Sequence, residues 1–413
     1  MKSWASLYLP PIAKRFNFPP LRLHNSVTGT LESLPVKSEY SMYVCGITPY
    51  DATHLGHAAT YITFDLINRY LRAMGKNVHF VENITDVDDP LLERATRDNV
   101  DWSVLAHSQI ELFRGDMSDL HILPPEHYIG AVEAIPLIVK MIEALKSKGA
   151  VYLVDDDLYF SVHMDKDFGT RSNLSQESML ELFGQRGGDP DRVGKHDKLD
   201  ALLWMRQRPN EPGWASSFGK GRPGWHVECC AIALNYLPIN SDDKFLIDIQ
   251  GGGSDLLFPH HEMGASQAAV VQGREFARFY VHTGMIGLDG EKMSKSLGNL
   301  VFLSELVNAG EDPMAIRLAL IRAPYAADRM WSDEKLISAT AFLTRLRLLL
   351  SRPEVAPTDP TIESIIAALS NNLDTQAALN AIEKWCDETE SGAVGGSAGE
   401  LSRAIDLLLG IAI

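Results

Sequence analysis

The chain has 413 residues and a net charge of −16; 45% of its residues are hydrophobic and 22% are charged. This length exceeds what one ordinary hydrophobic core serves, so it predicts two or three domains. No apolar run approaches the roughly 20 residues of a membrane-spanning helix. The acidic balance argues against a large nucleic-acid-binding surface, which needs clustered Lys and Arg. We therefore expect a cytoplasmic protein that binds neither membranes nor nucleic acid.

Strand and helix patterns alternate over residues 1–115. Apolar residues at 40–47 and 77–85 predict two buried strands, and the pattern between them predicts a helix at 57–75 that Gly75 ends. A strand, a helix and a second strand in this order predict parallel strands of a doubly wound (Rossmann) α/β sheet. We assign residues 1–115 to an N-terminal segment and the first half of the sheet domain.

The sheet pattern is then interrupted and later resumed. Residues 116–214 are polar and are predicted to be mostly helical, with a Gly-rich surface loop at 182–200. Strand patterns return at 244–255 and 279–290, which places the second half of the sheet domain within 215–330. The interruption predicts an inserted domain at 116–214.

From residue 331 onward the pattern is entirely helical, which predicts a C-terminal helical bundle at 331–413. The expected elements are a flexible linker at 391–399 and helices at 334–350, 361–373, 375–390 and 400–413.

The first candidate site for a phosphate is the segment His54-Leu55-Gly56-His57, between a predicted strand and a predicted helix. This position puts the two imidazoles and several backbone N–H groups at a helix N-terminus, where phosphates bind readily. Gly56 would allow a nucleotide to approach the backbone closely. Taken alone, the motif is a weak signal, because structural histidines produce the same pattern.

The second candidate is the segment Lys-Met-Ser-Lys-Ser at residues 292–296, in a Gly-flanked loop. Two lysines, Lys292 and Lys295, suit a polyanion that is held in the transition state and then released. Taken alone, this segment could be a solvated basic loop. The two motifs together, in this order, resemble the signature of class I aminoacyl-tRNA synthetases.

That resemblance implies a class I synthetase-like fold and activation of an amino-acid carboxylate. The carboxylate would attack the α-phosphate of ATP, giving an acyl-adenylate and pyrophosphate. His54 and His57 would stabilise charge on the phosphates, and Lys292 and Lys295 would stabilise the leaving pyrophosphate. Mg²⁺ would accompany the ATP.

A metal site is predicted from three residues near strand ends, Cys45, Cys229 and His260. Four cysteines are too few for a disulfide framework in so long a chain, so buried thiols or metal ligands are expected. Two thiolates and one imidazole are a ligand set that zinc takes in sites with an open fourth position. We expect one Zn²⁺ per chain, with Cys230 and His261 as the adjacent alternatives.

An open zinc position would explain how a site selects cysteine over serine. A pocket that measures only shape separates such near-isosteres poorly, whereas one that demands a specific bond discriminates strongly. A substrate thiolate binds zinc well, and a serine hydroxyl does not. The metal would thus bind the substrate side chain.

Over roughly residues 40–330 the chain resembles the cysteinyl-tRNA synthetase family. The matching blocks are "CGITPYDATHLGH", "NITDVDD", "GRPGWHVEC", "DIQGGGSDLLFPHHE" and "KMSKSLGN". Three departures point to a sister family, the ligase that joins cysteine to the amino sugar of glucosaminyl-inositol in mycothiol synthesis. Gly264 stands where synthetases supply a fourth zinc ligand, and Pro90 stands where they tend to carry lysine. Residues 185–190 resemble the Glu-Arg-Gly-Gly-Asp-Pro motif of the ligase, with Gln185 replacing its glutamate.

The predicted bundle supports the same choice. A synthetase carries an anticodon-reading domain beyond its bundle, and residues 332–413 hold twelve acidic residues against six basic ones, a poor surface for a tRNA backbone. The expected partners are therefore ATP, L-cysteine and glucosaminyl-inositol. The alternatives are a cysteinyl-tRNA synthetase or its truncated paralogue and, more distantly, a non-enzymatic zinc-binding module. The sequence gives no oligomeric state, and a monomer is the working expectation.

The resemblance also implies a pocket for cysteinyl-adenylate. Asp255 would bind the ribose together with its two preceding neighbours, Trp225 would close one wall, and Ile286 would contact the adenine. For Trp225 and Ile286, plain core packing is the alternative. The implied pocket residues are Cys45, Gly46, Ile47, Thr48, Thr60, Asn83, Ile84, Thr85, Trp225, Gly253, Ser254, Asp255 and Ile286.

A general base for the incoming amine is not identified. Asp86, Asp88 and Asp89 are candidates by location, and a helix N-cap is the alternative role for one of them.

Overall fold

The computed structural model describes residues 1–50, 53–241, 243–293 and 298–413. A five-stranded sheet runs through its centre in the order β11-β10-β3-β4-β5, and all neighbouring strands are parallel. The first of these strands along the chain thus lies in the middle, as in a doubly wound fold. The predicted α/β class is confirmed. The strands are β3 (Glu39–Val44), β4 (Asn77–Ile84), β5 (His127–Gly130), β10 (Phe245–Gly253) and β11 (Glu275–Thr283).

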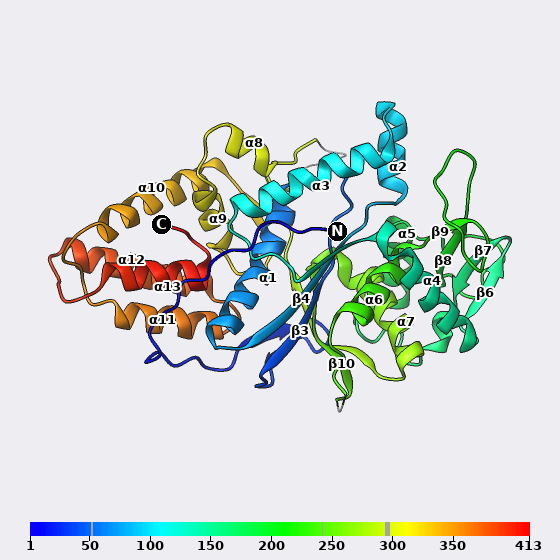
Figure 1. The fold of residues 1–413 in the computed structure, drawn as a ribbon, viewed down its shortest axis with the longest axis horizontal. Helices are drawn as coiled ribbons and strands as arrows, with labels where there is room; N and C mark the ends of the chain where they lie inside the picture. Colours follow the sequence, from blue (N-terminus) through cyan, green and yellow to red (C-terminus); the bar gives the residue numbers. More distant parts are fainter. Residues whose placement is uncertain (51–52, 242, 294–297) are drawn as a thin grey trace.

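Helices cover both faces of this sheet (Figure 1). Side chains alternate along β3, so Met42 and Val44 pack into one core cluster while Tyr43 and Cys45 pack into the other. The first cluster includes α1 (Leu55–Ala73), which ends before Gly75 as expected. The second cluster includes residues of α4 (Ala131–Ser147), α6 (Trp225–Tyr236) and α7 (Glu262–Gln272).

The order of the strands reverses between β3 and β10, which pair directly with Val44 opposite Gly251. In doubly wound sheets, ligands bind in the crevice outside the carboxyl ends of the strands at such a point. Cys45, Thr85 and Gly253 follow or end three of these strands. The residues that the sequence singles out therefore gather at one edge.

The prediction that residues 116–214 are mostly helical is wrong. This part of the chain holds α4 and α5 (Gln176–Gln185), but also most of a four-stranded antiparallel sheet, visible at the right of Figure 1. None of its strands exceeds six residues, too short for alternation to stand out against neighbouring turns. The predicted loop at 182–200 begins as the end of α5 and continues as turns. The strands are β6 (Val151–Val154), β7 (Asp157–Phe160), β8 (Ala201–Arg206) and β9 (Gly221–Pro223).

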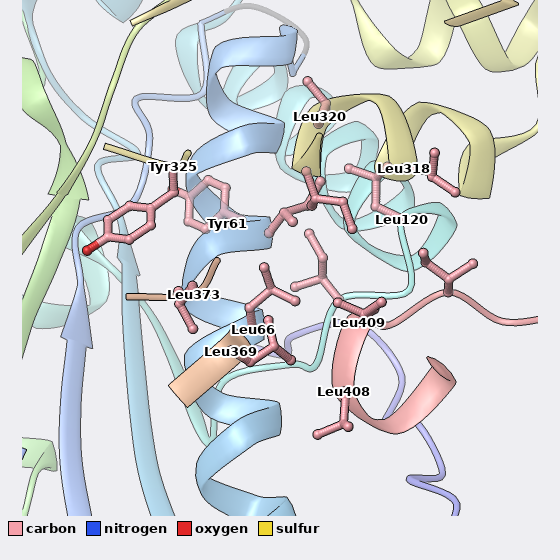
Figure 2. Close-up of a cluster of buried hydrophobic side chains, with 14 of the residues drawn as sticks. Tyr61, Leu66, Leu120, Leu318, Leu320, Tyr325, Leu369, Leu373, Leu408 and Leu409 are labelled. Carbon is pink, nitrogen blue, oxygen red and sulfur yellow. The ribbon is translucent and has the colours of Figure 1, made fainter. Parts of the chain in front are cut away.

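The C-terminal residues form four helices, as predicted. Figure 2 shows side chains of α1, of α9 (Pro313–Ile321) and of the bundle meeting in one apolar cluster, with Leu66, Leu318 and Leu408 among them. The bundle thus packs against the helix that begins at the His-x-Gly-His motif. Its helices are α10 (Asp333–Leu350), α11 (Asp359–Ser370), α12 (Thr375–Glu390) and α13 (Ala398–Leu409).

Two buried arginines join α1 and α9 to the end of α13. Arg69 and Arg317 both pair with Asp65, at 2.7 and 2.5 Å. Arg317 also donates to the carbonyl oxygen of Leu409 at 2.8 Å, and Arg69 donates to that of Asp406 at 2.7 Å. The last carbonyls of a helix have no partner within it, so the guanidinium groups satisfy them while Asp65 balances the charge.

The remaining elements surround the sheet. No helix in the described ranges is long and apolar enough to cross a lipid bilayer. These elements are β1 (Arg22–Asn25), β2 (Thr30–Ser33), α2 (Asp89–Asp98), α3 (Trp102–Asp119), β12 (Ile286–Leu288), β13 (Glu291–Lys292), α8 (Leu303–Asn308) and β14 (Arg329–Trp331).

Candidate active site

Cys45, Cys229 and His260 meet at the switch point of the sheet. Cys45 follows β3, Cys229 lies in the second turn of α6, and His260 lies in an irregular helical segment, Leu257–His261, between β10 and α7. Their ligand atoms all lie within 4.8 Å of one another. The three residues are only 3%, 6% and 2% exposed. Among the described residues, this is the group of His, Cys and acidic side chains that could hold a metal ion.

The two alternative ligands lie outside this group. Because Cys229 and Cys230 are consecutive on a helix, their side chains point about 100° apart, and the thiol of Cys230 contacts the carbonyl of Val227 at 3.4 Å. The Nε2 atom of His261 does reach the Sγ atom of Cys45, at 3.3 Å. Its Nδ1 atom contacts His282 at 2.8 Å, and His261 is not part of the three-residue group.

Further histidines surround the cluster. The Nδ1 atoms of His260 and His226 are 3.1 Å apart, and the Nε2 atom of His260 faces Cys229, so both nitrogens of the His260 ring are in hydrogen-bond contact. On the other side, the Nδ1 atom of His282 lies 2.8 Å from the hydroxyl of Ser26. Burial lowers the pKa of His226 well below its usual value, and lowers that of His282 to about 3, which keeps both rings neutral.

The two thiols of the cluster differ in acidity. Burial raises the pKa of Cys45 well above its usual value. Burial also opposes ionisation of Cys229, but hydrogen bonds from Cys45 and His260 outweigh it and lower the pKa of this thiol. Sulfur and imidazole ligands in a closely spaced, buried set suit a transition metal ion.

The His-x-Gly-His motif lies at the N-terminus of α1, as predicted. His54 is the N-cap, and its ring stacks on that of His57 at 3.7 Å. A Cβ atom at Gly56 would come within 2.8 Å of the His54 ring, so any other residue here would force that ring to shift. The N–H of Leu55 donates to Val301, and that of Gly56 to His54. The two side chains are therefore the better candidates for binding phosphate.

His57 has a buried ring nitrogen that could bond to a ligand. Its Nδ1 atom is buried and has no hydrogen-bond partner among the described residues. Burial, and then the neighbouring His54, lower the pKa of His57 well below its usual value. The ring is therefore neutral and can donate or accept one hydrogen bond.

The ends of β3 and β4 are held together through Asn83. Its side-chain oxygen accepts from the backbone N–H of Gly46 and from the hydroxyl of Tyr43, both at 2.9 Å. A Cβ atom on Gly46 would lie 1.6 Å from the carbonyl oxygen of Asn83, so only glycine fits. Residues 45–48 and 83–85, all predicted to line the adenylate pocket, are consequently neighbours.

Three threonines of the predicted pocket also bond to residues at this edge. The hydroxyl of Thr60 lies 2.8 Å from that of Thr283, at the end of β11. Thr85 donates to the buried carboxyl of Glu228 at 3.3 Å. The third, Thr48, donates to Asp88 at 2.6 Å.

The three acidic candidates for a general base all have structural partners. Asp88 caps α2 by accepting from the N–H of Leu91 at 3.0 Å, and burial raises its pKa to about 6. Asp86 accepts from the first turn of α4, through the N–H of Val132 at 2.9 Å. The carboxylate of Asp89 pairs with Arg222.

The other predicted pocket residues are more dispersed. Trp225 is half-buried at the start of α6 and stacks on His260, with ring centroids 4.3 Å apart. Gly253 ends β10, and Ser254 and Asp255 form the partly exposed turn that follows. Ile286 is 3% exposed and belongs to the large core cluster. Its predicted contact with adenine stays a prediction.

Of the two predicted catalytic lysines, Lys292 lies in β13, opposite Gly287 of β12. Lys295 lies outside the described residues, as do the other residues at 294–297.

Several polar residues at the site were not identified by reasoning from the sequence. Gln250 donates to the thiol of Cys45 at 3.3 Å, and His226, Glu228 and His282 make the contacts given above. His226 and Glu228 flank Cys229 closely, and Gln250 and His282 lie near the carboxyl ends of β10 and β11. Polar residues in such buried segments are the signal that could have identified them.

Gly264 lies in α7, beside the helix that carries Cys229. A Cβ atom there would be 3.6 Å from the carbonyl oxygen of His226 and 3.9 Å from Cys230, which is ordinary contact. A longer side chain at this position would extend beside α6. Glycine at this position therefore leaves out, next to the cluster, the ligand side chain that the resemblance assigns to synthetases.

Comparison with known proteins identifies the family of this chain. Residues 33–341 match the family model of the tRNA synthetases class I (C) catalytic domain. Relatives named L-cysteine:1D-myo-inositol 2-amino-2-deoxy-alpha-D-glucopyranoside ligase occur in Thermomonospora curvata and Streptomyces coelicolor. They are 52% and 51% identical to this chain over 421 and 420 residues, and each match covers 100% of both chains.

Solved structures confirm the fold at much lower identity. A Mycobacterium tuberculosis methionyl-tRNA synthetase bound by methionyl-adenylate has a TM-score of 0.62 at 17% identity, covering 86% of this chain and 83% of that one. The LeuRS of an Agrobacterium radiobacter LeuRS-tRNA-LeuAMS ternary complex has a TM-score of 0.64 at 13% identity, covering 92% and 84%. The chain therefore has the class I aminoacyl-tRNA synthetase fold and belongs to the family of L-cysteine:1D-myo-inositol 2-amino-2-deoxy-alpha-D-glucopyranoside ligases.

Proposed function

We propose that this chain is an ATP-dependent ligase that adenylates L-cysteine and transfers it to the amino group of glucosaminyl-inositol, as a step of mycothiol synthesis. The products are cysteinyl-glucosaminyl-inositol, AMP and diphosphate. The observation that carries the proposal is the buried cluster of Cys45, Cys229 and His260 at the switch point of a class I fold. It offers a means of selecting cysteine at the position where such folds bind their substrates.

The donor set fits zinc. Two sulfur atoms and one imidazole nitrogen within 4.8 Å suit a soft, borderline metal rather than Mg²⁺ or Ca²⁺. Gly264 offers no fourth ligand, and the network of His226, His261 and His282 fixes the orientation of the groups around the cluster. When bound, zinc would supply a vacant coordination position that takes the thiolate of the substrate and leaves a serine hydroxyl unbound.

In the first half-reaction, an oxygen of the cysteine carboxylate attacks the α-phosphorus of ATP, and diphosphate leaves. His54 and His57 bind the phosphates from the start of α1, with His57 contributing the free Nδ1 atom of a neutral ring. Lys292 and Lys295 stabilise the leaving diphosphate, which Mg²⁺ accompanies. Asp255 and the preceding turn bind the ribose, and Trp225 closes the cysteine pocket beside His260.

In the second half-reaction, the amine of glucosaminyl-inositol attacks the adenylate carbonyl. A C–N bond forms, the bond from carbonyl carbon to phosphate oxygen breaks, and AMP leaves while the amine loses a proton. Because Asp86 and Asp88 cap helices and Asp89 pairs with Arg222, none of the three is assigned as the base. The amide product distinguishes this reaction from the ester that a synthetase forms on tRNA.

The decisive experiment supplies ATP and cysteine together with either glucosaminyl-inositol or tRNA, and identifies the products by mass spectrometry. The amide should form with the amino sugar, and the tRNA should remain uncharged. Formation of cysteinyl-tRNA without the amide would replace this proposal with the synthetase alternative. Replacing cysteine with serine is the specificity control, and no serine product is expected.

A further inference from the structure

The segment at residues 185–190, Gln-Arg-Gly-Gly-Asp-Pro, touches the candidate site through one side chain. Arg186 follows α5, and its guanidinium donates from Nη1 to two carbonyl oxygens, that of Asp255 at 2.5 Å and that of Phe258. These carbonyls lie in the stretch that runs from the predicted ribose-binding turn to the metal-ligand candidate His260. One arginine of the insertion therefore bonds to the backbone that connects the ribose-binding turn with His260.

This stretch needs an external partner because it is irregular. A short helical turn at Ser254–Leu256 gives way to the segment Leu257–His261, in which Phe258 has extended torsion angles, φ −138° and ψ 136°. An extended residue interrupts the helical pattern in which each carbonyl accepts a bond from its own helix. A charged donor shared by two carbonyls fixes their separation and orientation.

The insertion holds the other side of His260 as well. Glu262, which begins α7 and is 1% exposed, accepts from the N–H groups of Gly169 and Ser172 at 3.0 and 2.8 Å. It also pairs with Arg171 at 3.0 Å. His260 thus lies between two attachment points, Arg186 before it and Glu262 after it, and both attach it to the same inserted segment.

The other residues of the motif shape the turn that carries Arg186. Gly187 has a φ of +85°, and a Cβ atom on Gly188 would lie 2.6 Å from the ring of Phe183, so the turn requires both glycines. Asp189 binds the ammonium of Lys195 at 2.9 Å and accepts from the hydroxyl of Tyr159, which fixes the end of the turn. Gln185 is exposed and donates to Glu181 at 3.0 Å, so this contact lies within α5 and not at the site.

We propose that Arg186 is a positioning residue that holds the 255–260 stretch so that His260 can bind the metal and Asp255 can bind the ribose. The inference rests on the metal-binding and ATP-binding parts of the proposed function. It is independent of which acceptor receives the cysteine.

The test compares Arg186→Met with Arg192→Met in the full-length, zinc-loaded protein. Arg192 lies in the same loop, but it binds Asp157 at 2.8 Å and Tyr159 at 2.8 Å, both within the inserted sheet. Zinc affinity is measured by competition with a chromophoric chelator, and the absorption spectrum of the Co²⁺-substituted protein reports the ligand geometry. Pyrophosphate exchange gives KM separately for ATP and for cysteine.

Arg186→Met should weaken zinc binding by about tenfold, the lower end of the effect of losing a partner that orients a metal ligand. It should also raise KM for both ATP and cysteine and alter the Co²⁺ spectrum. Arg192→Met should change each of these quantities less than twofold. Arg186→Lys keeps the charge and can donate to one carbonyl, so it should give an intermediate loss at an unchanged Tm, and it decides the question should Arg186→Met fail to fold.

Zinc affinity and both KM values within twofold of wild type in Arg186→Met would overturn the inference, as would equal losses in Arg192→Met, because the effect would then be one of insertion stability. A wild-type protein that bound no zinc and exchanged no pyrophosphate would overturn the proposed function together with this inference. A wild type with both activities but no amide product would overturn only the choice of acceptor.

Discussion

The Nε2 atom of His260 lies 3.1 Å from the Sγ atom of Cys229, although the two residues are 31 positions apart in the chain. One comes from an irregular segment after a strand and the other from the middle of a helix. Their approach, with Cys45 at the end of β3, brings together three side chains that could hold a metal ion.

If Cys45, Cys229 and His260 bind zinc as proposed, the substitution Cys229→Ser should remove the metal. A hydroxyl is a poor zinc ligand. Losing a residue that only orients a metal ligand costs up to about 100-fold in affinity, so losing the ligand itself should lower zinc affinity by more than about 100-fold. Cysteine-dependent pyrophosphate exchange should fall with it. Cys230→Ser is the matched control, since that thiol faces Val227, and it should keep its zinc by elemental analysis. Equal zinc content in the two variants would contradict the assignment.

Two Gly→Ala substitutions should have opposite effects on stability. In Gly46→Ala the new methyl group would lie 1.6 Å from a backbone oxygen, so the ends of β3 and β4 must separate. We expect a loss of at least about 1–3 kcal/mol in the free energy of unfolding, and loss of adenylate formation. In Gly264→Ala the contacts are ordinary, and a helical glycine is replaced, so a gain of up to about 1 kcal/mol is expected. Urea denaturation measures both.

Glu82 makes stability depend on pH. It lies in β4 with 0% exposure, and neither carboxyl oxygen has a hydrogen-bond partner among the described residues. Burial raises the pKa of Glu82 well above its usual value. The folded protein therefore retains a proton that the unfolded chain releases. The resulting pH-dependent cost is absent below the unfolded pKa and grows as pH rises above about 4.5.

The substitution Glu82→Gln removes this titration. Its Tm relative to wild type should rise between pH 5 and pH 8, with each unit of pKa shift worth about 1.4 kcal/mol. The exposed Glu363→Gln is the control and should show no such trend. A constant Tm difference for Glu82→Gln across this pH range would mean that the folded carboxyl is not perturbed.

Arg317→Met should destabilise the protein strongly. It would leave Asp65 with one arginine partner in place of two and would free the carbonyl of Leu409. Breaking a buried ion pair on one side typically costs about 3–5 kcal/mol. Arg322→Met removes a pair with Glu383 at a side chain that is 30% exposed, so its cost should stay below about 1 kcal/mol. Chemical denaturation of both variants gives the comparison.

Much of the fold could be predicted from the sequence, because long elements carry clear periodicity. The strands β3, β4 and β10 and the helices of the bundle were expected at nearly their observed positions, whereas the strand pattern predicted at 279–290 covers only the end of β11 and then β12. The inserted sheet was missed because its strands are short and its pairing joins segments as distant as β7 and β8. Such pairing depends on tertiary contacts that local patterns do not encode.

The candidate site likewise has a part that the sequence could predict and a part that it could not. Cys45, Cys229 and His260 could be proposed together because strand ends in this fold converge, although Cys229 lies in the helix α6 and not at a strand end. The hydrogen bonds of His226, His261 and His282 could not be proposed, since they depend on ring orientations set by the packing of α6 and α7. Likewise, nothing in the motif at 185–190 indicates which backbone oxygens Arg186 contacts.

The attachment of Arg69 and Arg317 to the last carbonyls of α13 has a thermodynamic consequence. If the bundle came apart, Arg69 and Arg317 would each lose a carbonyl acceptor on α13 while keeping Asp65, and an apolar side of α1 would meet water. Partial unfolding is thereby penalised, and bundle and sheet should melt together as a single cooperative unit.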